Sequence, residues 1–267
     1  MNENKKVMPE ALYSLDNGMS LEKLERAQES GSYVIGHVFL WNSVDQLLRV
    51  NLGNSIFGSI PLNEISIYPT VRANENLSPE VYSLIGSTIC ACVHEINGSS
   101  IVLSRRKNML NTFQSFSDSK GEIIDCFVKS PQSSAVYTDI GHGISGRIHV
   151  SDLCSSRLHH TSDIGIKKGD VIKVKISDIN QSNFFIDLSY KDLFEDLRGT
   201  LNIGDFIEAV VLDSINEDGY FSYVNPSTPA IVNIPSSLSI SYGTKIVARV
   251  KSFNAKGNLK LAFISLI

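Results

Sequence analysis

Short stretches in which apolar and polar residues alternate run along most of the chain. In Val171–Ile176, apolar residues alternate with two lysines, Lys173 and Lys175. A period of two residues is typical of a β-strand that has one buried and one solvated face. We therefore expect a strand here, with both lysines on its solvated face. The side chains expected to turn mostly inward are those of Val171, Val174 and Ile176.

The strand pattern occurs three times along the chain, in units of similar length. The glycines that open the three β-rich runs are Gly36, Gly121 and Gly204. The strands that close the units are 101–105, 186–191 and 259–263. A repeat of about 85 residues that holds about five short strands and one helical turn is typical of a small closed β-barrel. Alternation alone would also allow a β-sandwich.

Helical patterns lie outside the strand-rich units. Residues 20–28 begin with a serine that can cap a helix, and 105–116 and 193–201 follow the closing strands of the first two units. We predict an all-β fold with short helices, in which three tandem five-stranded barrels are joined by short helical linkers. The expected divisions are an N-terminal helical extension (1–30), a divergent first barrel (31–107), a helical linker (108–118), a second barrel (119–194) and a degenerate third barrel (195–267).

Composition narrows the class of protein. No apolar run approaches the roughly 18 residues that a membrane span needs, and the polar start, Met1–Lys6, lacks the apolar region of a secretory signal. We therefore expect a cytoplasmic protein without a membrane partner. The four cysteines show no zinc-finger spacing, so we expect reduced thiols and neither a metal nor another cofactor; they are Cys90, Cys92, Cys126 and Cys154.

Charge alone does not indicate a nucleic-acid-binding protein. The net charge is −4, and basic and acidic residues balance within each of the three barrel segments. A neutral barrel can still bind RNA through a local basic stripe, but weakly and with modest salt dependence. The distribution of basic and aromatic side chains therefore matters more than their sum.

The second unit carries motifs in a recognisable order. They are Gly121–Ile123, Tyr137–Gly141, Gly146–Leu153, Ile166–Asp170 and Leu188–Asp192. This segment resembles an S1 RNA-binding domain, the family of repeats found in ribosomal protein S1 and in polynucleotide phosphorylase. The first and third units resemble the same family more distantly, through Gly58–Glu64 and Gly219–Val224. The resemblance implies three tandem barrels of the OB fold.

The resemblance also implies where a ligand binds. In this family, aromatic side chains on the second and third strands stack on bases, and basic or polar groups contact the RNA backbone. In the second unit the family's second aromatic position is Tyr137 and its histidine is His149, whereas Ser134 stands at the first aromatic position and Phe185 at an arginine position. The predicted phosphate contacts of this unit are Lys129, Arg147 and Lys191.

The other two units match the family's binding residues unevenly. In the third unit Tyr220 and Tyr223 fill both aromatic positions, Asn233 replaces the histidine, and Lys260 supplies charge. In the first unit arginine and proline stand at the aromatic and histidine positions, so its stacking surface is predicted to be largely absent. These two residues are Arg49 and Pro61.

No catalytic motif occurs in the sequence, neither a phosphate-binding loop nor a nucleophile elbow. We expect a non-enzymatic protein that binds single-stranded RNA, including mRNA, in translation or mRNA handling and has no small-molecule substrate. Residues 31–107 are expected to contact the ribosome or a ribosomal protein. Two alternatives remain: an adaptor whose barrels bind protein instead of RNA, and a non-catalytic cofactor of RNA decay. Exposure of Tyr137, Tyr220 and Tyr223 on one face would favour RNA.

Overall fold

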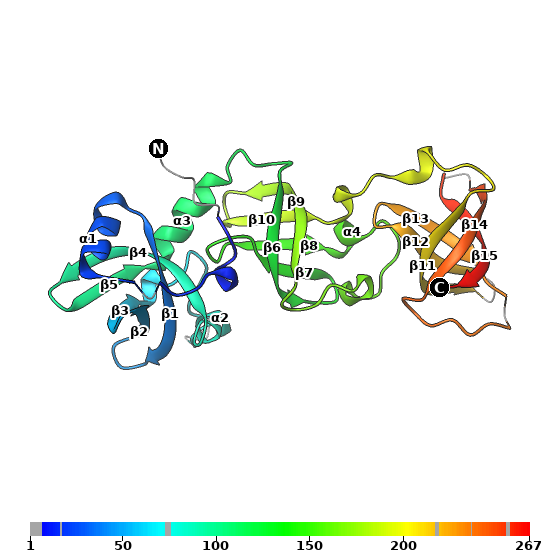
Figure 1. The fold of residues 1–267 in the computed structure, drawn as a ribbon. Helices are drawn as coiled ribbons and strands as arrows, with labels where there is room; N and C mark the ends of the chain where they lie inside the picture. The colour runs from blue at the N-terminus through cyan, green and yellow to red at the C-terminus, as the bar shows by residue number, and fades with distance from the viewer. Residues whose placement is uncertain (1–6, 17, 73–75, 217–218, 236, 255–256) are drawn as a thin grey trace. The chain divides into compact units, whose positions relative to one another are not determined.

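The chain folds into two compact units, each with a β-rich core. The computed structural model describes residues 7–16, 18–72, 76–216, 219–235, 237–254 and 257–267 (Figure 1). The first unit runs to residue 119 and includes the segments 139–145 and 179–185; the second unit holds 120–138, 146–178 and 186–267. Three closed barrels follow one another along the chain.

The first barrel is built from five strands in the order β1-β2-β3-β5-β4. Their bounds are β1 (Tyr33–Asn42), β2 (Leu47–Gly53), β3 (Ile56–Pro61), β4 (Thr88–Asn97) and β5 (Ser100–Ser104). The β3–β5 pairing is parallel, with Ser59 opposite Val102. Alternate residues of each strand point into a core that excludes water; Leu48, Val50 and Leu52 of β2 are all fully buried.

The second barrel repeats this arrangement, with the circular order β10-β8-β7-β6-β9. The strands are β6 (Ile123–Pro131), β7 (Ala135–Asp139), β8 (Ser145–His149), β9 (Val171–Asn180) and β10 (Phe185–Ser189). The third and fifth strands, β8 and β10, again pair in parallel. Buried side chains from every strand fill the interior: Cys126, Val136, Ile148, Val174 and Ile186 are among them.

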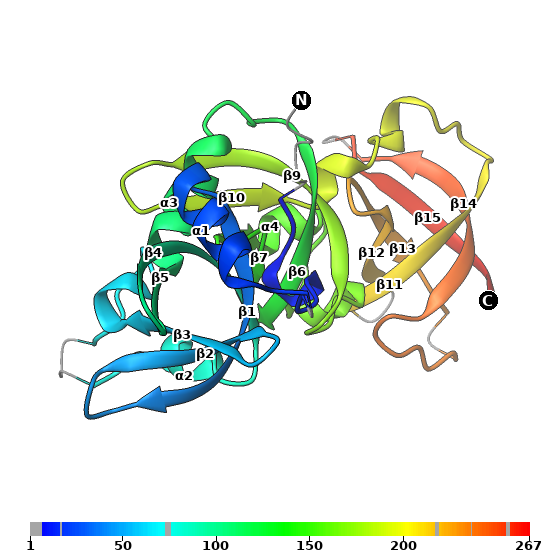
Figure 2. The ribbon, with the colours of Figure 1, turned by 60° about the vertical axis from the view of Figure 1, so that its left-hand side comes forward.

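The third barrel has the same order, β11-β12-β13-β15-β14. Figure 2 shows its strands in yellow through red: β11 (Phe206–Asn216), β12 (Gly219–Asn225), β13 (Thr228–Asn233), β14 (Lys245–Phe253) and β15 (Leu259–Leu266). The prediction of three five-stranded barrels is therefore confirmed. Closure of each sheet rules out the sandwich that alternation alone allowed.

Short helices surround the strands. They are α1 (Leu21–Ser30), α2 (Pro79–Ser83), α3 (Arg105–Ser115) and α4 (Val150–Leu153), with 3-10 turns η1 (Glu10–Leu12), η2 (Leu62–Glu64), η3 (Thr161–Ile164), η4 (Lys191–Leu193) and η5 (Leu197–Gly199). The Ser20 hydroxyl accepts the Lys23 amide to begin α1, and Gly31 ends it with a left-handed φ of 67°. The helix expected over 193–201 was wrong: η4 ends at Leu193, and the rest of this stretch holds the single turn η5, where the Asp196 side chain accepts the Arg198 amide.

The alternation in β9 was predicted with one error. Val174 and Ile176 are buried, and Lys173 and Lys175 lie on the opposite face, as expected. Val171, however, is 47% exposed, so its predicted inward orientation was wrong. It lies two residues before Lys173, and residues two apart on a strand share a face.

No helix in the described segments is long and apolar enough to cross a membrane.

Candidate nucleic-acid interface

The outer face of β7 and β8 gathers three of the predicted binding residues. On β7, Val136 and Thr138 are fully buried in the barrel, so Tyr137 between them points outward and is half-buried. On β8, Ile148 is buried, and Arg147 and His149 on either side of it point outward. Because β7 and β8 are hydrogen-bonded neighbours, the structure brings an aromatic ring, a guanidinium and an imidazole onto one surface.

Arg147 is held in place from the neighbouring strand. Asp187 lies directly opposite it in the parallel pairing of β8 with β10. The Asp187 carboxylate accepts from Arg147 Nε at 3.0 Å and from Nη2 at 2.7 Å. The arginine side chain remains 41% exposed. The pair therefore fixes the direction of the guanidinium while leaving part of it accessible to a phosphate.

His149 is oriented by the start of α4. Its Nδ1 accepts the backbone N–H of Ser151 at 3.3 Å and lies 2.8 Å from the Ser151 hydroxyl. A ring nitrogen that accepts from a backbone amide carries no hydrogen, so in the neutral ring the hydrogen is on Nε2. His149 is exposed, and its Nε2–H is available as a donor toward a ligand.

The remaining predicted residues of this barrel differ in their surroundings. Lys129 is exposed near the end of β6, and Phe185 is half-buried at the first position of β10. Lys191 is bound within the protein: its Nζ donates to the Ser151 carbonyl at 2.7 Å and lies 3.3 Å from Asp152 Oδ1. It therefore holds η4 against α4, which limits its reach toward a phosphate.

Sequence reasoning missed an aromatic side chain on β6. Phe127 is half-buried between Cys126 and Val128, both of which are fully buried. It therefore points outward on the same side as Lys129, and β6 is the other neighbour of β7. The alternation of residues along β6 could have predicted that Phe127 points outward. Phe127 is therefore an additional outward ring on the strand next to β7.

The structure does not bring Tyr220 and Tyr223 together. Both lie on β12, three residues apart, and therefore on opposite faces. Tyr220 pairs with Val232 across β12 and β13 and packs against the core of the third barrel. Tyr223 pairs with Pro229 and faces outward. Its side chain is nevertheless half-buried, and this burial raises its pKa to about 12. The two rings do not form the shared platform that the resemblance implied.

Phe221 shares the outer face of β12 with Tyr223. Phe221 pairs with Ile231 of β13, and Ile231 pairs in turn with Lys260 of β15. Lys260 is exposed between two buried leucines, so these three residues form one outward row. Asn233 is exposed at the end of β13. Sequence reasoning missed Phe221, although its spacing of two from Tyr223 places both on one face.

The first barrel carries an exposed aromatic pair that was not predicted from the sequence. Phe39 and Phe57 are 45% and 50% exposed, and their ring centroids lie 5.7 Å apart at 70°. Phe39 stands at an irregularity of β1 between Val38 and Leu40, and Phe57 lies opposite Asn51 of β2. The expected residue Arg49 is exposed on β2. This surface therefore keeps aromatic rings, although from other positions than the family's.

A buried charged network joins four segments of the first unit. The Glu10 carboxylate accepts from Arg105 Nη2 at 2.7 Å and Nε at 2.9 Å, and also from the Cys90 amide at 3.1 Å. The Glu10 amide donates to Asp139 at 2.8 Å. The second oxygen of Asp139 accepts the amides of Gly141 and Gly143. The loop that follows β7 is thereby attached to the N-terminal segment and to α3.

His142 is part of the same buried region. Its Nε2 lies 2.9 Å from the Tyr13 hydroxyl and its Nδ1 2.8 Å from the Thr112 hydroxyl. Burial lowers the pKa of His142 to about 4, with the Arg105 charge adding to the effect and Glu10 opposing it. The ring is therefore neutral near pH 7 and serves to position the loop. Burial likewise raises the pKa of Tyr13 and Tyr33.

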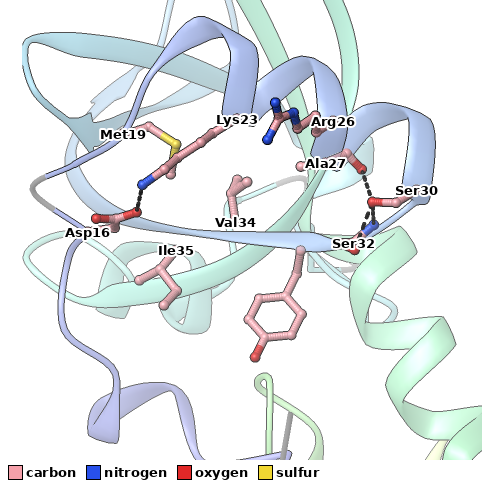
Figure 3. A pocket seen from close by; sticks show the side chains of 10 residues that line it. Asp16, Met19, Lys23, Arg26, Ala27, Ser30, Ser32, Val34 and Ile35 are labelled. Carbon is pink, nitrogen blue, oxygen red and sulfur yellow. Dashed lines mark hydrogen bonds and ion pairs between the residues drawn. The ribbon is translucent and has the colours of Figure 1, made fainter. Parts of the chain in front are cut away.

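A pocket of about 270 Å³ lies between α1 and β1 (Figure 3). Lys23 and Arg26 reach over it from the helix, and Met19 and Val34 are among the apolar groups lining it. Lys23 Nζ lies 3.2 Å from Asp16, so its charge is already paired within the protein. Within the described residues no cluster of histidine, cysteine or carboxylate side chains could hold a metal ion.

Comparisons with known proteins show which sequences and structures this chain resembles. Residues 117–191 match the family model described as the S1 RNA binding domain, so the second barrel is an S1 domain. Among curated proteins, small ribosomal subunit protein bS1 of Staphylococcus saprophyticus is 32% identical over 127 residues, covering 46% of this chain and 31% of that protein. The protein of the same name from Rhizobium meliloti is 26% identical over 227 residues, covering 80% and 38%.

The chain thus spans about a third of the length of the curated relatives that it matches. Two solved structures are also similar. A multidomain Streptococcus pneumoniae protein with nucleic acid binding domains is 15% identical, with a TM-score of 0.26, and the match covers 87% of this chain and 73% of that one. GSP13 from Bacillus subtilis is 18% identical, with a TM-score of 0.26, covering 28% and 56%.

Proposed function

We propose that this chain, whose second barrel is an S1 RNA-binding domain, binds single-stranded RNA through the outer face of β7 and β8 and catalyses no reaction. One observation carries the proposal: Tyr137, Arg147 and His149 share that face. Each supplies a different part of what an RNA strand requires, namely a stacking surface, a phosphate contact and a hydrogen-bond donor.

The face is suited to weak binding that depends little on base identity. Stacking on an aromatic ring is worth about 1–3 kcal/mol per base and tolerates every base. Arg147 is partly neutralised by Asp187, and the whole chain carries a net charge of −4. The electrostatic contribution is therefore small. Tandem barrels compensate because binding by one raises the effective concentration of the strand at the next.

The cellular role that fits best is in translation or mRNA handling in the cytoplasm. The supporting observation is the similarity to small ribosomal subunit proteins over as much as 80% of the chain. In this scheme residues 31–107 contact the ribosome or a ribosomal protein, and the exposed pair Phe39 and Phe57 provides an apolar surface for that contact.

A second candidate, a protein-interaction adaptor, is favoured by one feature of the third barrel. Tyr220 packs against the core and Tyr223 is half-buried, so neither predicted ring is a freely exposed stacking surface. An adaptor of this kind would bind a protein through all three barrels and would not respond to RNA.

The experiment that separates these functions is a fluorescence-anisotropy titration with a labelled single-stranded RNA of about 20 nucleotides. Tyr137→Ala is expected to weaken binding about tenfold, because it removes one stacking ring. Tyr82→Ala is the matched control, since Tyr82 is an exposed tyrosine on the helix α2 and not on a strand. Equal affinities of the two variants would contradict the proposed site, and absence of binding by the unmodified protein would favour the adaptor.

A further inference from the structure

A pocket of about 410 Å³ lies within the second unit, on the outer face of the third barrel. Its lining comes from four places: the segment after α4 of the second barrel, the turn η5, the strands β12 and β13, and the loop before β15. The residues that matter most are Ser156, Arg157, Arg198, Phe221, Ile231 and Asn258. The volume falls within the range of about 300–1,000 Å³ that small-ligand pockets occupy.

The floor of this pocket is apolar and includes an aromatic ring. Phe221 and Ile231 are cross-strand partners on the outer faces of β12 and β13. Both are half-buried, so their side chains keep accessible surface. Lys260 stands next to Ile231 on β15, which extends the row with an exposed ammonium group.

Cationic groups stand around this floor. The Arg157 guanidinium carbon lies 5.9 Å from the centroid of the Phe221 ring, a distance typical of a cation–π contact. Arg198 donates from Nη1 to the Asn258 amide oxygen at 3.1 Å and from Nε to both Asp196 oxygens at 2.9 and 3.0 Å. Arg198 is therefore held rigidly, with its charge partly balanced by Asp196, which lies outside the lining. No acidic side chain is among the described residues that line the pocket.

The segment that carries Arg157 is tied to the third barrel by hydrogen bonds. The Ser155 amide donates to the Pro226 carbonyl at 2.7 Å, in the turn between β12 and β13. His159 Nε2 lies 2.6 Å from Asp213 of β11. These contacts lie on both sides of Arg157 and hold it over Phe221.

We infer that this pocket is a composite nucleotide site of an RNA strand, assembled from the second and third barrels. Phe221 stacks on a base, Arg157 contacts that base or its phosphate, and Arg198 with Lys260 contacts neighbouring phosphates. An aromatic floor among cations suits a nucleotide, which has both a π-face and a charged phosphate. The inference rests on the proposed function and extends it, because the third barrel alone lacks Arg157 and its site is incomplete.

The test uses the full chain and the same labelled RNA, with single substitutions in the pocket. Phe221→Ala is expected to weaken binding at least fivefold. Arg157→Ala is expected to weaken binding and to reduce the slope of log affinity against log salt by about one. Since Arg157 is an exposed surface residue, its replacement also guards against a folding defect in the phenylalanine variant.

The third barrel offers a matched control. Arg249 lies 6.0 Å from the ring of Phe206, a similar cation–π pair that lines no part of this pocket. Phe206→Ala and Arg249→Ala are expected to stay within about twofold of the unmodified affinity. If Tyr137→Ala weakens binding while both pocket variants match the Phe206 control, the composite site is wrong and the proposed function stands. If the unmodified chain does not bind RNA, both are wrong.

Discussion

Replacing Gly143 by alanine should loosen the attachment of the loop 139–145 to the N-terminal segment. Gly143 has a φ of +80°, and a Cβ there would overlap the Arg105 guanidinium and lie 3.0 Å from Glu10 Oε2. The left-handed backbone alone costs an L-residue about 1–2 kcal/mol. Separating a buried ion pair costs about 3–5 kcal/mol more, because it leaves charges without a partner. We therefore expect a local destabilisation of about 4 kcal/mol or more.

Gly165→Ala is the matched control for this substitution. Gly165 has nearly the same φ, +84°, but a Cβ there would meet nothing within 4 Å. It should therefore show only the backbone cost of about 1–2 kcal/mol. The difference between the variants, about 3 kcal/mol, isolates the effect of the clash with the buried pair.

Hydrogen-exchange mass spectrometry measures this difference locally, which suits a chain of several barrels that need not unfold in one step. The informative peptides cover residues 7–13 and 139–145, which contain the Glu10, Gly141 and Gly143 amides that donate to Asp139. A loss of 3 kcal/mol corresponds to exchange that is roughly 100-fold faster. If Gly143→Ala and Gly165→Ala raise the exchange rate by the same factor, each in its own segment, then the clash with the buried ion pair adds no cost.

Substitutions of His142, Tyr220 and Arg147 should each change one measurable property of the protein. Because burial lowers the pKa of His142 to about 4 from its ordinary value of 6.5, the contribution of the neutral ring to stability should be fully present above pH 6.5 and should be lost, by up to about 3 kcal/mol, as the pH falls toward 4. His142→Gln should flatten the pH dependence of hydrogen-exchange protection in residues 139–145. Tyr220→Ala should lower the stability of the third barrel by about 3 kcal/mol, more than Tyr223→Ala does, because Tyr220 packs against the core whereas Tyr223 faces outward. Equal losses of stability by calorimetry would contradict this. Arg147→Gln should weaken RNA binding and lower the salt slope by about one; an unchanged slope would show that Arg147 contacts no phosphate.

The repeat and the alternation predicted the strands and the three units, and the resemblance to S1 domains decided in favour of closed barrels over a sandwich. Each strand has one buried face, and a period of two residues records that fact directly in the sequence. The same rule explains the errors. The position of Tyr220 was taken from a family resemblance, whereas its spacing of three from Tyr223 places it on the opposite face of β12.

The buried network of the first unit was not predictable from the sequence. Glu10 and Arg105 are separated by 95 positions, and each looks like an ordinary solvated charge in its own segment. Only the folded chain shows that they form a buried pair. Phe39 and Phe57 were missed for a similar reason: they come together across strands, and one of them lies at an irregularity that local alternation does not reveal.

The central claim, that RNA lies on the outer face of β7 and β8, is tested most directly by ultraviolet cross-linking of single-stranded RNA to the full chain, followed by mass spectrometry of the linked peptides. A ring stacked on a base is close enough to cross-link, so linked peptides should include Tyr137 or the β8 residues Arg147 and His149. Replacement of Tyr137 by alanine should remove the first of these. Cross-links confined to the first barrel, or absent altogether at low salt, would contradict the account.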